Sequence, residues 1–227
     1  GLYVHIPFCR SICSFCPYCK ELFDHGTAEK YFLALLKEID LVCAGQDHRK
    51  ATSLYFGGGS PALMVNYLGE IIQKLKKHFT ILGGIGVELH PDDITEETLQ
   101  RLKRAGVTML SIGIQSFDEA CLKTLGRNQT DYGDILRKLQ LVRSFGFSVL
   151  DMDLIFAIPN QTVSSIAKDI QIAFDNGATQ ISTYPWIDFS FAKNQYRPMP
   201  ERKKKRLLKA IALIGNQKNL ERTSVWT

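Results

Sequence analysis

The chain has 227 residues, of which 45% are hydrophobic and 10% aromatic, and this composition excludes a disordered or collagen-like protein. Its 28 Lys and Arg against 23 Asp and Glu give a formal charge of +5, a mild excess that does not indicate a nucleic-acid partner. No apolar run approaches the ~18 residues of a membrane span, since even residues 32–45 contain Lys37, Glu38 and Asp40. No signal peptide is recognised either, so we expect a cytoplasmic protein.

Strand-like and helix-like segments alternate along the sequence. Strands are predicted over residues 2–7, 53–56, 85–89, 109–114, 148–155 and 180–184. Helices are predicted over residues 28–43, 64–79, 95–105, 118–125, 133–145, 164–176 and 201–214. Six βα units in succession predict a parallel sheet with right-handed crossovers and helices outside it.

The predicted strands each have one apolar and one polar face. In the first strand, Val4 and Ile6 share the apolar face, and Tyr3 and His5 share the other. A closed barrel would fill its interior with branched apolar side chains, so the polar face indicates a wider barrel that holds a polar ligand at the C-terminal strand ends. We therefore predict an α/β fold with a partial (β/α)6 parallel barrel, and an open doubly wound sheet is the alternative.

Three cysteines follow the first strand at C-x3-C-x2-C spacing: Cys9, Cys13 and Cys16. Three thiolates this close in sequence can bind one inorganic centre, and they leave one metal position open for a substrate or cofactor. A zinc site is the alternative, although zinc sites more often use paired C-x2-C elements. Cys43 and Cys121 lie in helical patterns, and we expect both to be core thiols.

The residues around these cysteines resemble the radical S-adenosylmethionine enzymes, and among them the oxygen-independent coproporphyrinogen III oxidase-like family. Besides C-x3-C-x-F-C, the resemblance rests on LYVHIPFC at 2–9, GGGSP at 57–61, SIGIQSF at 111–117 and DLIFAIP at 153–159. It implies that Cys9, Cys13 and Cys16 hold a [4Fe-4S] cluster and that S-adenosylmethionine chelates the fourth iron. Cys19 stands one residue later than the last cysteine of the oxidase motif, so its family role is not carried over.

Polar side chains end the inward faces of three predicted strands, namely Glu88, Gln115 and Asp153. Any one of them alone is as readily a buried polar group that neighbouring backbone satisfies. Together with Arg127, they supply acceptors for an ammonium and for ribose hydroxyls, and a guanidinium for a carboxylate. The resemblance implies that all four contact S-adenosylmethionine.

Three glycines end the second predicted strand, and their missing Cβ atoms allow a ligand to approach the backbone. The pattern is not G-x-G-x-x-G and lacks the lysine of a phosphate loop, so a nucleotide phosphate is not expected. The resemblance implies contacts near the sulfonium and cluster for Tyr3 and Phe15, at the methionine amino group for Gly58, Gly59 and Ser60, and at adenine for Tyr184. Tyr3 is also the candidate catalytic residue.

The resemblance implies that the reduced cluster cleaves S-adenosylmethionine to methionine and a 5′-deoxyadenosyl radical. The radical would then act on a tetrapyrrole, as in the coproporphyrinogen dehydrogenase step of porphyrin biosynthesis, with flavodoxin or ferredoxin as electron donor. Methyl transfer within the same family and non-enzymatic haem binding or haem transfer are the alternatives. Residues 1–227 are expected to form one radical SAM core domain without the family's C-terminal substrate-covering region.

Two C-terminal segments allow more than one interpretation. Trp186 and the aromatic residues within 189–191 either belong to the core or line the pocket of a flat aromatic substrate. The basic run 202–206 precedes apolar residues at helical spacing, which favours a solvated helix start over a binding patch.

Overall fold

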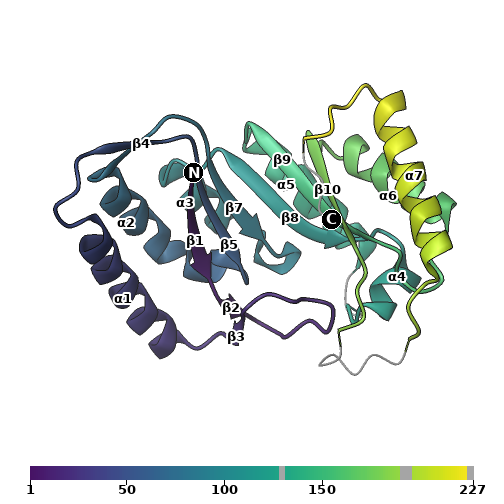
Figure 1. The fold of residues 1–227 in the computed structure, drawn as a ribbon, viewed down its shortest axis with the longest axis horizontal. Coiled ribbons are helices and arrows are strands. Elements are labelled where there is room, and N and C mark those ends of the chain that lie inside the picture. Colours follow the sequence, from purple (N-terminus) through teal and green to yellow (C-terminus); the bar gives the residue numbers. More distant parts are fainter. Residues whose placement is uncertain (128–130, 190–195, 224–227) are drawn as a thin grey trace. The chain divides into compact units, whose positions relative to one another are not determined.

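A computed structural model describes residues 1–127, 131–189 and 196–223, and its largest element is a parallel sheet (Figure 1). The sheet has six strands in the order β1-β5-β7-β8-β9-β10. Their bounds are Leu2–Ile6 for β1, Leu54–Gly58 for β5, Ile85–Leu89 for β7, Met109–Gln115 for β8, Val149–Phe156 for β9 and Gln180–Pro185 for β10. All six predicted strands are therefore present, and the prediction of a parallel α/β sheet is confirmed.

Helices follow the strands along the chain as the pattern predicts. They are α1 (His25–Cys43), α2 (Val65–Lys76), α3 (Glu96–Arg104), α4 (Glu119–Thr124), α5 (Tyr132–Ser144), α6 (Val163–Asp175) and α7 (Glu201–Gln217). Capping side chains fix several starts: Asp24 accepts a hydrogen bond from the N–H of Thr27 at α1, and Thr162 forms a capping box with Ser165 at α6. Because Asp24 caps α1, this helix begins three residues before the predicted start.

Short elements account for the differences from the sequence-based elements. Two small parallel pairs join β2 (Phe8–Cys9) to β3 (Glu21–Leu22) and β4 (Arg49–Ala51) to β6 (Phe79–Ile81). The helix predicted over 64–79 begins at Val65, one residue later than predicted, because the 3-10 helix η1 (Pro61–Met64) precedes it. It ends at Lys76, three residues early, because the chain enters β6 at Phe79. A second 3-10 helix, η2 (Pro91–Asp93), follows β7. Strands of two or three residues are too short for periodicity to reveal them.

The chain divides into two compact units that are not contiguous in sequence. The first unit contains residues 1–12, 18–112 and 140–150, and the second contains residues 13–17, 113–139 and 151–227. The single domain expected from the sequence remains a prediction.

The first unit has its core between β1, β5 and β7 and the helices α1 to α3. Ile6, Phe56, Val87 and Leu99 are fully buried there. Figure 1 shows α1 and α2 side by side, and they are in contact. Cys43 is buried at the end of α1, which confirms it as a core thiol.

In the second unit, Trp186 and Cys121 pack in one buried cluster with Leu125, Ile155 and Ile158. Trp186 is therefore a core residue, Cys121 is the expected core thiol, and burial raises the pKa of Cys121 to about 12. Phe189 is half-buried, whereas Phe191 lies outside the described residues.

None of the helices in the part of the chain that the structure describes is both long enough and apolar enough to cross a membrane.

Candidate functional site

In the first unit, the glycine turn after β5 lies against Glu88 of β7. The N–H of Gly58 donates to Oε2 of Glu88 at 2.9 Å, and Gly58 has a φ of 116°, a conformation that favours glycine. A Cβ on Gly57 would lie 2.6 Å from Oε1 of Glu88, so a larger residue here would displace the Glu88 side chain. Burial raises the pKa of Glu88, and the hydrogen bond from Gly58 opposes that shift. Two predicted cofactor residues, Gly58 and Glu88, are therefore in direct contact.

Gly59 brings the same turn against the first cysteine. Its N–H donates to the carbonyl of Ile6 at 2.7 Å, and a Cβ at this position would collide with the carbonyl of Phe8 and lie 2.9 Å from Sγ of Cys9. Ser60 follows, buried, and its hydroxyl donates to Oδ2 of Asp93. The predicted residues Gly59 and Cys9 are thus adjacent, whereas the Ser60 hydroxyl is bonded within the protein.

Asp93 itself is a buried carboxylate that the sequence analysis did not identify. Besides the Ser60 hydroxyl, it binds Arg10, whose Nε donates to Oδ1 at 2.7 Å and whose Nη2 lies 2.6 Å from the same atom. Asp93 is 3% exposed. Through Asp93, η2 therefore holds Arg10, which follows Cys9, and Ser60, which follows Gly59.

Tyr3 and His5 share the polar face of β1, as the alternation predicts. His5 Nε2 donates to the carbonyl of Cys19 at 2.9 Å, since a carbonyl only accepts, and His5 Nδ1 lies 3.1 Å from the Tyr3 hydroxyl. Partial desolvation, and secondly the negative charge of Glu88, raise the pKa of Tyr3 to about 12. Tyr3 is therefore a neutral phenol, 58% exposed, whose ring stacks on Tyr55 with centroids 6.5 Å apart.

The predicted metal ligands belong to different units: Cys9 to the first, and Cys13 and Cys16 to the second. All three are partly buried, and the N–H of Cys16 donates to the carbonyl of Cys13 at 3.3 Å, which closes a turn between them. Cys19 is exposed, and none of the six cysteines forms a disulfide. Over residues 1–127, 131–189 and 196–223, no three His, Cys, Asp or Glu side chains form a group that could hold a metal ion. The assignment of these ligands remains a prediction.

Phe15 and Arg127 come together in the second unit. Phe15, between Cys13 and Cys16, packs against the cluster that contains Trp186. The guanidinium of Arg127 lies over the Phe15 ring, 5.7 Å from its centroid, and its Nη1 donates to the carbonyl of Gly113 at 2.6 Å. The cysteine loop of this unit is therefore anchored by an apolar contact and by a cation that β8 holds in place.

Gln115, Asp153 and Tyr184 stand on the strands of the second unit. Gln115 ends β8 with a φ of 71°, a left-handed conformation that costs energy in residues other than glycine. In the parallel register Asp153 pairs with Ser182, so Asp153 and Tyr184 point from neighbouring strands to one face. Both side chains are half-buried.

Asp169 on α6 is a residue that the sequence analysis missed. It is 1% exposed, and it accepts hydrogen bonds from the Ser116 hydroxyl at 2.7 Å and the Phe117 N–H at 2.8 Å. Burial raises its pKa to about 6 despite these bonds. The carboxylate therefore holds the two residues that follow Gln115. Only the position of Ser116 within SIGIQSF pointed to this region, and no pattern identified its partner on α6.

Comparisons with known proteins agree with the expected relationship. The chain is 31% identical over 189 residues to the heme chaperone HemW of Bacillus subtilis, covering 82% of this chain and 50% of that protein. It is 30% identical over 211 residues to the oxygen-independent coproporphyrinogen III oxidase of Pseudomonas aeruginosa, covering 89% of this chain and 44% of that enzyme. The chain thus spans about half the length of these relatives.

Among solved structures, coproporphyrinogen III oxidase (HemN) from Escherichia coli, described as a radical SAM enzyme, matches with a TM-score of 0.84 at 26% identity. The match covers 96% of this chain and 52% of that protein. It confirms the predicted α/β fold of the radical SAM type. The model of the radical SAM superfamily matches residues 3–173, which is more than half of the chain. The chain therefore belongs to the radical SAM superfamily.

Proposed function

We propose that the chain binds a [4Fe-4S] cluster through Cys9, Cys13 and Cys16 and S-adenosylmethionine beside it. Radical SAM proteins use these two cofactors, and the proposal assigns this chain's ligands. The observation that carries it is the contact of Gly59 with Cys9, because a Cβ there would lie 2.9 Å from Sγ. The glycine turn therefore leaves the space around the Cys9 thiol free of side chains. Three cysteine ligands leave the fourth iron of a [4Fe-4S] cluster without a protein ligand. When bound, the cluster supplies the electron that cleaves S-adenosylmethionine to methionine and a 5′-deoxyadenosyl radical.

The remaining residues orient the cofactor. Glu88, held by the Gly58 N–H, accepts from the methionine ammonium, and Arg127 binds its carboxylate. Asp153 accepts from the ribose hydroxyls. Tyr184 stands two residues beyond Ser182, the register partner of Asp153, on the same face of the sheet, and it packs against adenine. Gln115 adds a side-chain amide from the strained end of β8.

Tyr3 contributes position rather than proton transfer in this proposal. With a pKa of about 12 the phenol stays neutral, and its hydroxyl is bonded to His5. Its exposed ring, stacked on Tyr55, supplies an aromatic wall beside the sulfonium.

For the reaction we propose oxidation of a tetrapyrrole side chain, in keeping with the relatives named oxygen-independent coproporphyrinogen III oxidase. The radical would abstract a hydrogen atom from a propionate and become 5′-deoxyadenosine. The substrate radical would then lose carbon dioxide and pass one electron to a separate one-electron acceptor, which would leave a vinyl group. Flavodoxin or ferredoxin would supply the electron that starts each cycle. Methyl transfer to a tetrapyrrole would be detected in the same assay as a product of different mass.

A second candidate function is haem transfer without turnover. Relatives in Bacillus subtilis and Lactococcus lactis are named heme chaperone HemW, at 31% and 27% identity. A haem-transfer protein binds haem in a fixed ratio and gives no product that depends on a substrate.

The first experiment is anaerobic reconstitution with iron and sulfide, then addition of dithionite and S-adenosylmethionine. We expect the wild type to hold four irons and release 5′-deoxyadenosine, and we expect a Cys9→Ala, Cys13→Ala, Cys16→Ala triple variant to do neither. Cys19→Ala is the matched control and should keep its iron, since Cys19 contributes its carbonyl to His5. Equal iron content in the wild type and the triple variant would overturn the ligand assignment.

The second experiment separates the two functions. The reconstituted protein is incubated with coproporphyrinogen III, and the products are analysed by mass spectrometry, while haem binding and transfer to an apo-haemoprotein are measured in parallel. Decarboxylated product supports the oxidase. Stoichiometric haem transfer without any tetrapyrrole product supports the chaperone and rejects the oxidase.

A further inference from the structure

The second unit contains an open pocket of about 590 Å³ outside the residues assigned above. Its walls come from residues 159–162 of the loop between β9 and α6, from the first two residues of α6, and from residues 197–200 with the first turns of α7. Figure 1 shows α6 and α7 side by side, and the two helices are in contact. Because the loop follows β9 directly, the pocket lies at the C-terminal end of the strand that carries Asp153, where ligands of parallel α/β sheets bind.

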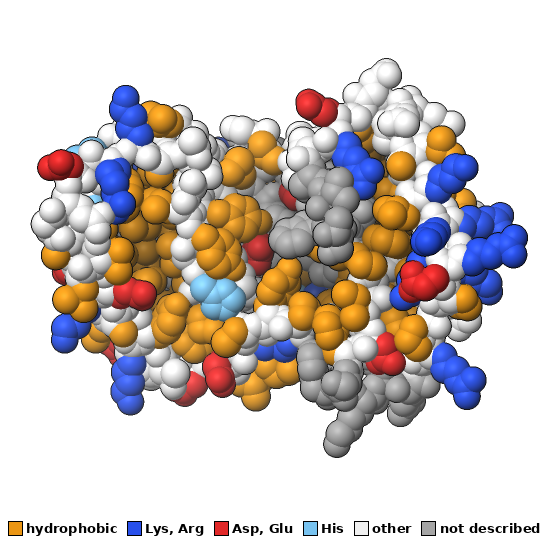
Figure 2. All heavy atoms as spheres, viewed as in Figure 1, with side chains coloured by type: hydrophobic (Ala, Val, Ile, Leu, Met, Phe, Trp, Pro, Cys, Tyr) orange, Lys and Arg blue, Asp and Glu red, His pale blue; other side chains and the backbone are white. Residues whose placement is uncertain are grey.

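The charge of the pocket has one sign. Arg197, Lys203 and Arg206 line it, and no acidic residue does. Within the described ranges none of these three side chains forms an ion pair, whereas the neighbouring Lys204 is bound to Glu201 at 2.8 Å. Figure 2 shows Lys and Arg side chains gathered over α7. Three cations left without a counter-charge around one cavity attract an anion.

The backbone adds to this field. α6 has 13 residues and α7 has 17, and both helices begin at the pocket, so the positive ends of two helix dipoles meet there. The Thr162 hydroxyl accepts from the N–H of Ser165, so the N–H groups of Val163 and Ser164 at the start of α6 remain for a ligand.

A buried amide in the same wall lacks one partner. Gln161 is 6% exposed, and its Nε2 donates to the carbonyl of Ile155 at 3.2 Å. Its Oε1 is buried and has no hydrogen-bond partner among the described residues. A buried acceptor without a donor is costly, so the fold leaves one polar group in this wall of the pocket unsatisfied.

We propose that this pocket binds the anionic oxygens of a ligand with two or more carboxylate or phosphate groups. The cations at Lys203 and Arg206, one helical turn apart, grip one group, and Arg197 with the helix starts grips another. Carboxylates would come from the propionate arms of a tetrapyrrole, and this source rests on the proposed function. Phosphate would come from a different ligand and needs no such assumption.

The test measures binding of coproporphyrin III and of inorganic pyrophosphate to the full chain by calorimetry. Lys203→Gln with Arg206→Gln removes two charges from the pocket wall. Arg202→Gln with Lys205→Gln is the matched control, because it removes two exposed charges from the same turns of α7 that do not line the pocket. We expect at least one probe to bind about tenfold more weakly to the pocket variant and within about twofold of wild type to the control.

Several results decide the proposal. Loss confined to coproporphyrin III identifies carboxylates as the ligand, and loss confined to pyrophosphate identifies phosphate. Equal weakening in both double variants, or no binding of either probe to wild type at about 1 mM, overturns the site. The wild-type 5′-deoxyadenosine assay is run beside it, so failure of the radical chemistry is recognised separately from failure of the pocket.

Discussion

Asp169 is buried on α6, and it links the pH dependence of stability to the strained strand end at Gln115. Its pKa rises from 3.8 to about 6 in the folded chain because burial disfavours the charged form. Between these pH values the folded chain keeps a proton that the unfolded chain releases, so folding binds protons there. The stabilisation is complete below about pH 4 and is lost as the pH rises through about 6.

The variant Asp169→Asn isolates this contribution, because the amide stays uncharged. Relative to the variant, we expect wild type to lose on the order of 2–3 kcal/mol of unfolding free energy between pH 4 and pH 7. Urea unfolding of both proteins at intervals across this range checks it. Asp134→Asn is a control of opposite sign, because Lys138 lowers the pKa of that exposed carboxyl. Parallel pH profiles for wild type and Asp169→Asn would contradict the expected linkage.

Glu88 allows a sharp test of cofactor binding in the first unit. Glu88→Gln keeps an oxygen to accept from the Gly58 N–H but removes the negative charge offered to an ammonium. We expect S-adenosylmethionine to bind about tenfold more weakly while the iron content stays at the wild-type level, since Glu88 is not a predicted cluster ligand. Calorimetry with iron analysis on the same preparation measures both. Unchanged affinity would remove Glu88 from the site.

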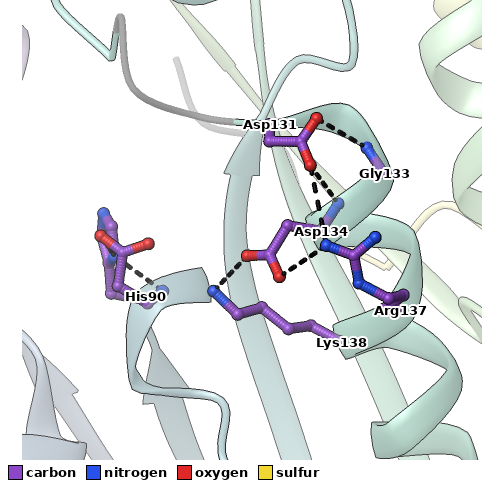
Figure 3. A network of polar contacts seen from close by, with 7 residues as sticks. His90, Asp131, Gly133, Asp134, Arg137 and Lys138 are labelled. Carbon is purple, nitrogen blue, oxygen red and sulfur yellow. Dashed lines mark hydrogen bonds and ion pairs between the residues drawn. The ribbon is translucent and has the colours of Figure 1, made fainter.

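At the scale of elements, α5 shows how one side chain starts a helix. Figure 3 shows Asp131 directed at the first turn, where it accepts from the N–H groups of Gly133 at 3.3 Å and Asp134 at 3.0 Å. Asp134 in turn binds Lys138 at 2.7 Å, one helical turn along. Asp131 thus caps the helix and leaves the side-chain pairs to stabilise its exposed face.

We expect Asp131→Ala to cost about 1 kcal/mol, because two backbone donors lose their acceptor. Lys138→Ala should cost about 0.5 kcal/mol or less, since exposed ion pairs contribute little. Thermal unfolding gives the two values, and amide exchange locates the fraying in the first turn of α5. A larger loss for Lys138→Ala than for Asp131→Ala would show that the ion pair, not the cap, holds this helix.

Periodicity predicted the long elements because their burial follows it. In β1, Val4 and Ile6 are buried and Tyr3 is exposed, as the alternation requires. It could not predict β2 with β3 or β4 with β6, because strands of two or three residues contain no full period. It also says nothing of backbone strain: Ala157 has a φ of 62°, a conformation that favours glycine, in a run that reads as an ordinary strand end.

The residues of the candidate site likewise fall into those that the sequence could identify and those that it could not. The motif residues could be named from sequence, and the structure joins Gly58 to Glu88 and Phe15 to Arg127. Asp93 and Asp169 could not be named, because each acts through partners more than thirty residues away in sequence, and no local pattern records such a contact.

At the scale of the whole molecule, the two units cannot be separated by one cut. Residues 140–150 belong to the first unit, although residues 113–139, which precede them, belong to the second. Within it, the Ser148 N–H donates to the carbonyl of Thr108 at 2.8 Å, and Lys103 Nζ donates to the carbonyl of Gly146 at 3.2 Å.

A fragment of residues 1–112 should therefore fail to fold, because it lacks the segment that completes its own core. A fragment of residues 1–150 contains every part of the first unit and should retain secondary structure. Circular dichroism and thermal unfolding of the two fragments compare them directly. A cooperative transition in the shorter fragment would show that residues 140–150 are dispensable.

Gly59 sets a condition for anyone who would move this site to another protein. Its side chain is only a hydrogen atom, and no larger side chain fits against the Phe8 carbonyl and the Cys9 thiol. A designer who grafts the cysteine loop onto a new parallel sheet must therefore graft the turn from the neighbouring strand with it. The unit that can be transferred is therefore the cysteine loop together with the glycine turn after β5, although the two segments lie far apart in the sequence.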